Sequence, residues 1–519
     1  MSALAIIALS QGYRVSGSDA RAGAQLDAVR EAGATCFVGH DARHVGGSDA
    51  HDDARDDEAL TLVDPPEVVV VSSAVPGDNV EVAFARRAGI PVFSRAQWLG
   101  RVTRGREVAA VAGTHGKTST SAALAVALRS AGLDASAIVG GNVPQFPGGR
   151  NAVGGGDDVF VVEADEYDGA FLGLEPATAV LLNVEHDHPD VFEDESATLA
   201  MFEKFLRRVK PGGLVVACGD DANVRALVAG LTNERNGEKD ASRDAVRCVS
   251  FGFGAANAWR AVNLKSDAST GGCSFTVTRE GAFFTDMSVP GTGAYAALNA
   301  LAAFVAALET LKSAANKRAS DDFADEARLR RSLVRSLATH EGVARRMQLI
   351  GETMACAVYD DYAHHPTAAR LAIAAIRERH ANARVAVAFQ PHTFARTEAM
   401  FDAFADALGA EEGADALVVT PVFDARPERG RASRDGGVAA RLAARAGGAF
   451  AATEEEAVDA LVDAVGRGAN ETETSAKKRR KGEDDRETPR RGEKAFVVLC
   501  LGAGAGFDVA RRVFARVSE

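Results

Sequence analysis

The chain has 519 residues, of which 46% are hydrophobic and 25% charged, as is typical of a globular protein with several domains. A net charge of −13 argues against nucleic-acid binding, which depends on basic side chains that contact phosphates. The apolar runs are shorter than a membrane span, and the six cysteines lack metal-binding spacing, so they are interpreted as buried thiols in a reducing compartment. We therefore expect neither a nucleic-acid nor a membrane partner.

The N-terminal residues predict part of a nucleotide-binding α/β unit. Residues 2–10 form an apolar helical pattern, and a strand at 13–17 follows it and ends at Ser18-Asp19. An Asp at the end of the second strand is typical of such a unit, whose first strand and glycine loop would precede Met1. We therefore expect a Rossmann-like domain over residues 1–105 that lacks its first strand because the sequence is truncated. The other elements expected here are a strand at 68–71, a helix at 79–88 and a short strand near Val92.

A glycine loop follows the apolar run 108–112 and precedes a helical pattern at 121–131. Its residues are Gly113, Thr114, His115, Gly116, Lys117, Thr118 and Ser119. A strand, glycine loop and helix in this order present backbone N–H groups to phosphate. Lys117 can reach the terminal phosphates, and the hydroxyl of Thr118 can bind Mg²⁺. The spacing is one glycine short of the standard phosphate loop, since Val111 stands at that glycine's position, but the pattern still predicts a nucleotide site.

Polar residues follow two further buried strands. The run 159–162 leads into Glu163, and the run 179–182 leads into Asn183 and the His188 region. Ligands collect where parallel strands end, so we expect these three side chains beside the Lys117 loop. A strand at 214–218, a β-rich segment at 245–290 and a helix at 294–311 that carries Asn299 complete a central P-loop-type ATPase domain, residues 106–341.

The remaining residues, 342–519, predict a C-terminal Rossmann-like α/β domain. Strands are expected at 354–359, 385–389, 417–420 and 496–501, and alanine-rich helical segments alternate with them. A polar segment interrupts this pattern, and another lies in the N-terminal domain. The basic stretch at 468–494 could be a nuclear address, but we interpret it as an exposed, disordered insertion. The Asp- and His-rich stretch at 41–63 is interpreted as a solvated acidic loop rather than a metal cluster.

Six segments in one order resemble the Mur ligase family. They are the glycine loop, Glu163-Ala164-Asp165-Glu166, the run from Asn183 to His188, Arg345-Arg346-Met347-Gln348, the run from Asp360 to Thr367, and Phe389-Gln390-Pro391-His392. The resemblance implies three domains that bind a UDP-sugar, bind ATP and complete the site. It also implies an ADP-forming reaction that joins L-alanine to UDP-N-acetylmuramate through an acyl phosphate, in peptidoglycan precursor synthesis. The expected enzyme is a monomer or homodimer, in the cytoplasm or, in a plastid-bearing source, the plastid stroma.

The resemblance also implies roles for individual residues. ATP would be bound by the loop Gly113, Thr114, His115, Gly116, Lys117, Thr118 and Ser119, with Asn299, Arg345 and Asp361. Mg²⁺ would be held by Thr118, Glu163 and His188, and the catalytic residues would be Lys117, His188, His364 and Arg396, the last two near the incoming alanine. Candidate UDP contacts are Ser18, Asp19, His40, Ser72 and Ser73. The alternatives are a nucleotide-binding protein of this family without ligase activity, and a related Mur or folylpolyglutamate-type ligase.

Overall fold

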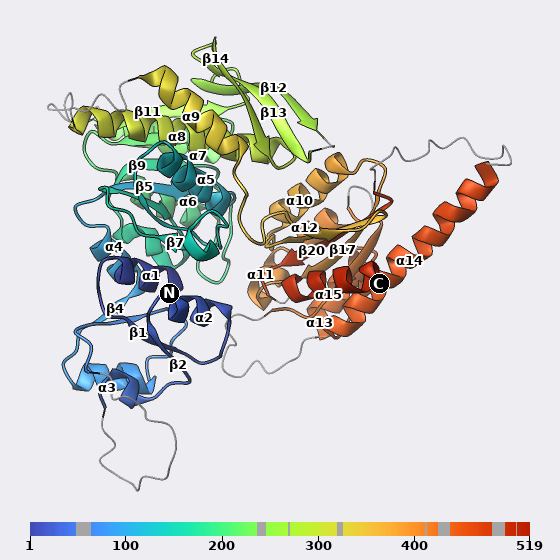
Figure 1. Cartoon of the computed structure of the whole chain (residues 1–519), viewed down its shortest axis with the longest axis horizontal. Coiled ribbons are helices and arrows are strands. Elements are labelled where there is room, and N and C mark those ends of the chain that lie inside the picture. Colours follow the sequence, from blue (N-terminus) through green and yellow to red (C-terminus); the bar gives the residue numbers. More distant parts are fainter. Residues whose placement is uncertain are drawn as a thin grey trace, which may run out of the picture.

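The computed structural model describes residues 1–47, 64–235, 245–267, 270–318, 325–409, 413–423, 436–479, 494–504 and 506–519. Most of the acidic stretch at 41–63, and residues 480–493 of the basic stretch, lie outside this description. The described strands form a ten-stranded sheet, a six-stranded sheet and two sheets of two strands each. The ten-stranded sheet and its helices form the middle of the molecule, with the N-terminal part on one side and the six-stranded sheet on another (Figure 1).

The N-terminal part contains two short parallel strand pairs, β1 with β2 and β3 with β4, in separate sheets. Its elements are α1 (Ser2–Ser10), β1 (Ser16–Asp19), α2 (Ala24–Glu31), β2 (Thr35–Val38), β3 (Val69–Val71), α3 (Val80–Arg87), β4 (Val92–Ser94) and α4 (Arg95–Val102). The strand expected at 13–17 is displaced, since β1 begins only at Ser16. Helix α1 buries Leu4 and Ile7 in the same apolar cluster as strands of the ten-stranded sheet, so it packs against that sheet.

The ten-stranded sheet has the order β14-β13-β12-β11-β10-β9-β5-β8-β6-β7. Its strands are β5 (Glu107–Ala112), β6 (Ser136–Ile138), β7 (Ala152–Val153), β8 (Val159–Glu163), β9 (Pro176–Leu181), β10 (Leu214–Cys218), β11 (Arg247–Gly252), β12 (Trp259–Asp267), β13 (Gly272–Arg279) and β14 (Ala282–Pro290). Strand β5 pairs in parallel with both β8 and β9. The ends of these three strands therefore meet at one edge of the sheet, as the sequence predicted.

Helices cover both faces of this sheet. They are α5 (Lys117–Ser130), α6 (Glu195–Leu206), α7 (Ala222–Arg235), α8 (Ala294–Arg318) and α9 (Glu326–Ala338). One apolar cluster joins α5, α8 and α9 to one face, and a second joins α6 and α7 to the other. Helix α8 has the length and apolarity of a membrane span over Ala294–Lys317, but 67% of that window is buried within the protein, as in a core helix.

The six-stranded sheet has the order β15-β16-β20-β17-β18-β19, and only β15 is antiparallel to its neighbour. The elements are β15 (Gln348–Glu352), β16 (Cys356–Asp361), α10 (Pro366–Arg379), β17 (Arg384–Gln390), α11 (Phe394–Ala399), α12 (Phe401–Leu408), β18 (Ala416–Val419), α13 (Gly436–Arg445), β19 (Ala449–Phe450), α14 (Glu454–Arg479), β20 (Phe496–Gly502) and α15 (Gly506–Ser518). Helices α10, α12 and α13 pack on one face, and α14 and α15 on the other.

One helix boundary differs from the sequence prediction, and one helix enters the stretch that we interpreted as an insertion. Helix α5 begins at Lys117, four residues before the predicted start, because Gly116 has a left-handed backbone that turns the loop directly into the helix. Helix α14 continues to Arg479 and projects from the C-terminal part (Figure 1), and the disordered insertion expected at 468–494 stays a prediction. The predicted domain limits at residues 105 and 341 stay predictions.

The chain passes from the ten-stranded to the six-stranded sheet through a short linker after α9. Gln145 binds this linker at three points. Its side-chain amide donates to the carbonyl of Thr339 at 3.3 Å, and its oxygen accepts from His340 and from the backbone N–H of Glu341, both at 3.0 Å. One side chain of the central part therefore fixes where the linker leaves it.

Candidate active site

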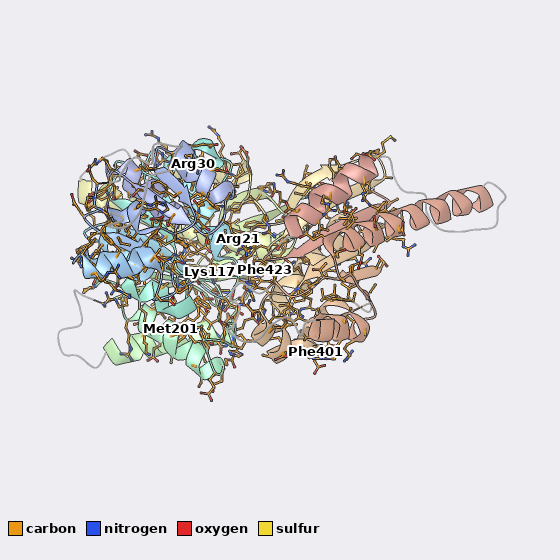
Figure 2. All side chains as sticks on the ribbon, turned by 90° about the horizontal axis from the view of Figure 1, so that it is seen from below. Arg21, Arg30, Lys117, Met201, Phe401 and Phe423 are labelled. Carbon is orange, nitrogen blue, oxygen red and sulfur yellow. The ribbon has the colours of Figure 1, made fainter. Side chains whose placement is uncertain are left out.

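One cleft of about 1770 Å³ is lined by residues from all three parts of the molecule. The N-terminal part contributes Ser72, Ser73 and Arg95, the central part the loop from Thr114 to Ser119, and the C-terminal part His364 and Arg396. In Figure 2, Lys117 lies near the middle of the molecule, between these parts. The cleft is where the predicted site residues gather.

The glycines of the loop are required by the close approach of neighbouring groups. Gly113 has φ +140°, and a Cβ there would lie 3.0 Å from the carbonyl oxygen of Asn183. Gly116 has φ +85°, and a Cβ there would lie 2.5 Å from the side-chain oxygen of Asn299. Asn183 also binds the backbone of His115. The Asn183 side chain accepts a hydrogen bond from the His115 N–H at 2.7 Å and donates one to the His115 carbonyl at 3.1 Å. Asn183 and Asn299 thus lie against the loop, in the region that the sequence predicted.

Lys117 is paired with a carboxylate that the sequence did not single out. Its ammonium group donates to both carboxylate oxygens of Glu166, at 2.9 and 2.8 Å, and to the carbonyl of Gly113 at 2.7 Å. Burial alone would lower the pKa of Lys117, but Glu166, with further carboxylates nearby, raises it. Burial also raises the pKa of Glu166 to about 7, against the opposing effect of Lys117. Lys117 is therefore a cation, and its ion pair with Glu166 holds it beside the loop.

Thr118 and Glu163 form the second cluster at the loop. The Thr118 hydroxyl donates to Glu163 at 2.8 Å, and Glu163 also accepts from the backbone N–H of Gly140. Arg346, from the segment after the linker, donates to the same hydroxyl at 2.9 Å. The structure therefore brings together two of the three predicted Mg²⁺ ligands and adds an arginine from the C-terminal part.

The third predicted ligand, His188, lies with other groups. Its Nε2 is 3.9 Å from a Glu166 oxygen and 3.7 Å from an Asp187 oxygen. Arg396 donates to its Nδ1 at 3.1 Å, which leaves the proton of the neutral ring on Nε2. Burial lowers the pKa of His188, so the ring is neutral near pH 7. In this arrangement His188 faces two carboxylates as a donor, and its role as a ligand stays a prediction.

Arg396 is buried at the contact between the central and C-terminal parts, with 1% of its surface exposed. Its guanidinium donates to Asp187 at 2.8 and 2.7 Å and to Nδ1 of His392 at 2.7 Å. Burial would raise the pKa of Asp187, but Arg396 and the neighbouring histidines hold it well below its usual range. The guanidinium that we expected beside the alanine carboxylate is thus bound to a carboxylate of the protein itself.

His364 lies beside this pair. Its Nδ1 contacts the carbonyl of Tyr362 at 2.8 Å, and its ring centroid lies 5.0 Å from that of His392. Burial, Arg396 and His392 lower the pKa of His364 well below the usual value. With Nδ1 donating to a carbonyl, the neutral ring keeps a lone pair on Nε2. Nε2 is therefore able to accept a hydrogen bond at the cleft.

The two adjacent arginines, Arg345 and Arg346, make different contacts. Arg345 was the predicted nucleotide contact, but its side chain donates to Asp360 at 3.0 Å and to the carbonyl of Gly502 at 2.6 Å. Asp361, the other predicted contact, accepts from the backbone N–H groups of Met347 and Ala363, both at 2.7 Å. Both predicted residues line the cleft, and they fix the turn that directs Arg346 toward Thr118.

Left-handed backbone conformations gather around the cleft. Among the described non-glycine residues, His188, Arg345, Met347 and Thr393 have φ values of 57°, 61°, 45° and 60°. Such conformations cost free energy and persist where the surroundings impose them, often at functional sites. Each of these four residues lines the cleft.

The candidate UDP contacts separate into two groups. Ser72 and Ser73 line the cleft. Ser18 instead donates to Glu81 at 2.6 Å and contacts His40 at 3.1 Å, while Asp19 accepts from the backbone N–H of Arg21. The structure therefore does not bring Ser18, Asp19 and His40 together with the two serines.

His340 in the linker provides a test of how the linker is held. Burial lowers its pKa to about 4, and among the described residues its buried Nε2 has no hydrogen-bond partner. An unfolded histidine takes up a proton near pH 6.5 and the folded one does not, so stability falls as the pH drops from 6.5 toward 4. His340→Asn keeps a donor for Gln145 but does not titrate. Between pH 7 and pH 5, we expect the wild type to lose about 2 kcal/mol more unfolding free energy than the variant. Denaturant titrations at both pH values measure this difference, and equal losses would contradict it.

Three family descriptions match the chain in order. Residues 1–107 match "Mur ligase family, catalytic domain", residues 111–307 match "Mur ligase middle domain", and residues 345–470 match "Mur ligase, glutamate ligase domain". Together they span most of the chain, and the middle one includes the glycine loop and the ends of β8 and β9.

Two bacterial relatives have the same printed name, UDP-N-acetylmuramate–L-alanine ligase. The protein from Frankia casuarinae is 38% identical over 447 residues, which are 82% of this chain and 81% of the relative. The protein from an Arthrobacter species is 37% identical over 428 residues, 82% of this chain and 80% of the relative.

Two solved structures have the same fold. The UDP-N-acetylmuramate–alanine ligase of Thermotoga maritima has a TM-score of 0.69 at 22% identity, covering 100% of this chain and 96% of its own. A murein peptide ligase of Psychrobacter arcticus has a TM-score of 0.62 at 20% identity with the same coverage. The α/β architecture predicted from the sequence is thereby confirmed.

Proposed function

We propose that this chain, which belongs to the Mur ligase family, joins L-alanine to UDP-N-acetylmuramate in an ATP-dependent, ADP-forming reaction of peptidoglycan precursor synthesis. The observation that carries the proposal is that the candidate catalytic side chains in the cleft come from two domains. The central domain supplies Lys117, Thr118 and Glu163, and the C-terminal domain supplies Arg346 and His364. A phosphate loop in a nucleotide-binding protein alone would not need these C-terminal residues. The chemistry belongs to the cytoplasm, where ATP is available and the six free cysteines stay reduced.

The first step is transfer of the γ-phosphoryl group of ATP to the carboxylate of the sugar substrate. Positioning and neutralisation of charge dominate such a transfer. The loop N–H groups and the start of α5 receive the phosphates. Lys117, now bound to Glu166, turns toward the phosphoryl oxygens, and Arg346 approaches them from the C-terminal domain. Lys117 and Arg346 thus stabilise the transferring group from opposite domains.

Mg²⁺ fits beside this loop. The hydroxyl of Thr118 and the carboxylate of Glu163 are 2.8 Å apart, and both are hard oxygen donors of the kind that Mg²⁺ prefers. When bound, the ion neutralises charge on the phosphate oxygens. Thr118 and Glu163 are the residues that would hold it.

The second step is attack of the alanine amine on the acyl phosphate, with release of phosphate. The amine must lose a proton, and we assign its acceptance to His364, which lines the cleft and keeps a lone pair on Nε2. Arg396 is saturated by Asp187, His188 and His392, so we assign it the positioning of these groups. Closure of the domains keeps water away from the acyl phosphate.

The reaction itself is the direct test. The full chain is incubated with ATP, Mg²⁺, UDP-N-acetylmuramate and L-alanine, and ADP release is followed together with the mass of the UDP-sugar product. We expect ADP release that depends on both substrates and a product that is larger by one alanine residue. ADP release independent of alanine, or with no new product, would leave only nucleotide hydrolysis and would refute the ligase assignment. Glycine and other amino acids tested in place of alanine define the specificity.

Arg346→Ala is expected to lower kcat about 100-fold, which is typical when one donor to developing charge is removed. The variant should still bind ATP, because Lys117 and the loop N–H groups are unchanged. Arg331→Ala, on the exposed face of α9, is a control with the same substitution and should keep full activity. Steady-state kinetics with saturating substrates test both variants. An unchanged kcat in Arg346→Ala would show that the arginine is only a contact of the closed structure.

A further inference from the structure

Glu185 connects the phosphate loop to the C-terminal domain. It follows β9 in the central domain, and its backbone N–H and carbonyl both bond to the side chain of Thr114 in the loop, at 3.0 and 3.1 Å. Its carboxylate accepts from Nε2 of His115, the next loop residue. Two successive residues of the loop are therefore held by one residue outside it.

The same carboxylate is bound by the C-terminal domain. The hydroxyl of Thr367, in the first turn of α10, donates to the second oxygen of Glu185 at 3.0 Å. Nδ1 of His365 lies 3.8 Å from the first oxygen, and its ring centroid lies 4.7 Å from that of His115. His365 caps α10 through Nδ1, which accepts from the backbone N–H of Thr367 at 3.3 Å, and its Nε2 contacts the carbonyl of His186 at 3.3 Å. The start of α10 therefore rests on the segment that holds the loop.

The charges favour this arrangement. Burial alone would raise the pKa of Glu185, but His115, His365 and the Thr367 hydroxyl lower it overall, so the group is a carboxylate near pH 7. A partly buried carboxylate needs donors, and here one comes from each domain. If the C-terminal domain moves away, the Glu185 carboxylate loses the Thr367 donor and, among the residues that the structure describes, keeps the His115 donor.

We propose that Glu185 is a positioning residue that couples docking of the C-terminal domain to the conformation of the phosphate loop. In the closed molecule the bond from Thr367 fixes the carboxylate, which fixes His115 and with it the loop before Lys117. The loop takes its catalytic conformation only when α10 is docked, so ATP is not cleaved in the open enzyme. This inference rests on the proposed ligase function for its kinetic test, but not for its structural test.

The kinetic test is a double-mutant cycle in the full chain with Thr367→Val and Glu185→Gln. Thr367→Val removes one hydrogen bond to a charged group, and we expect kcat to fall about ten-fold. The KM for ATP should stay within about two-fold, because the open central domain already binds the nucleotide. The double variant should be no slower than Glu185→Gln alone, since either change breaks the same connection. Thr353→Val is the matched control, because the contacts of its hydroxyl in the described part of the chain lie within a turn of the C-terminal domain, and it should keep wild-type kcat.

Effects of the two substitutions that multiply in the double variant would overturn the coupling. So would a loss of ATP affinity that matches the loss of kcat, because Glu185 would then act on nucleotide binding alone.

Small-angle scattering with a non-hydrolysable ATP analogue separates this inference from the ligase assignment. We expect the analogue to compact the wild type and Thr353→Val but not Thr367→Val. If the wild type compacts and Thr367→Val does not, but the wild type makes no amide, the ligase assignment fails and the coupling stands. Equal compaction of all three proteins would refute the coupling.

Discussion

Lys117→Ala is expected to lower ATP turnover by about a thousand-fold or more, because it removes the cation that stabilises the transferring phosphoryl group. Coupled measurement of ADP release determines this loss. The substitution also has a structural cost, because Lys117 is not a free surface group. It is the partner of Glu166, of which only 1% is exposed. The alanine variant leaves that carboxyl buried without its cation, and the melting temperature should fall.

A second substitution separates the two effects. Glu166→Gln in the Lys117→Ala background removes the unpaired acid and should recover most of the lost melting temperature without any recovery of turnover. Lys204→Ala, on the exposed face of α6, is the matched control and should change neither quantity. Turnover within ten-fold of the wild type in Lys117→Ala would show that the loop lysine does not serve phosphoryl transfer.

Arg396→Ala should destabilise the folded chain by about 3–5 kcal/mol, because it leaves the buried carboxylate of Asp187 without its cation. It should also abolish ligation, since Arg396 holds both His188 and His392 in place. Denaturant unfolding followed by fluorescence, together with the ligation assay, measures the two losses. Because the ion pair joins two domains, the loss of stability should appear first as separation of these domains.

Two variants test whether the buried charge is the cause. Asp187→Asn in the Arg396→Ala background removes the unpaired charge and should restore part of the stability but not the activity. Arg445→Ala breaks an exposed interaction with Asp402 and Asp406, and should change the unfolding free energy by about 0.5 kcal/mol or less. If the Arg396 and Arg445 variants lose equal stability, the Asp187–Arg396 pair has no special role.

The part of the site that could be predicted from the sequence is the part encoded in contiguous residues. The glycine loop is one uninterrupted segment, and Glu163 and Asn183 each follow directly after an apolar strand. A parallel sheet aligns the ends of such strands, so the rule that places ligands there was sufficient to bring both residues near Lys117. Apolar runs of this kind also predicted four strands in each of the two large sheets, while residues 245–290 of the ten-stranded sheet were predicted only as a β-rich segment.

The contacts across the cleft could not be predicted in this way. Arg345 and Arg346 are adjacent and identical in type, and only the left-handed backbone at Arg345 and Met347 decides which guanidinium reaches Thr118. Arg396 and Asp187 are 209 positions apart, and no local pattern indicates that one neutralises the other. Glu166 and Glu185 each lie within a motif of the sequence. Their spacing did not indicate that Glu166 binds Lys117 or that Glu185 binds Thr367.

The short linker held by Gln145 makes domain closure an intramolecular event. In the part of the chain that the structure describes, the backbone passes only once between the two large sheets, so the C-terminal domain is tethered beside its partner at a high effective concentration. Contacts that would be too weak to keep two separate proteins together are then sufficient to close this cleft. Because the tether keeps the two domains together, the cleft can open after each turnover without loss of the C-terminal domain, so that ADP and the extended sugar nucleotide can leave.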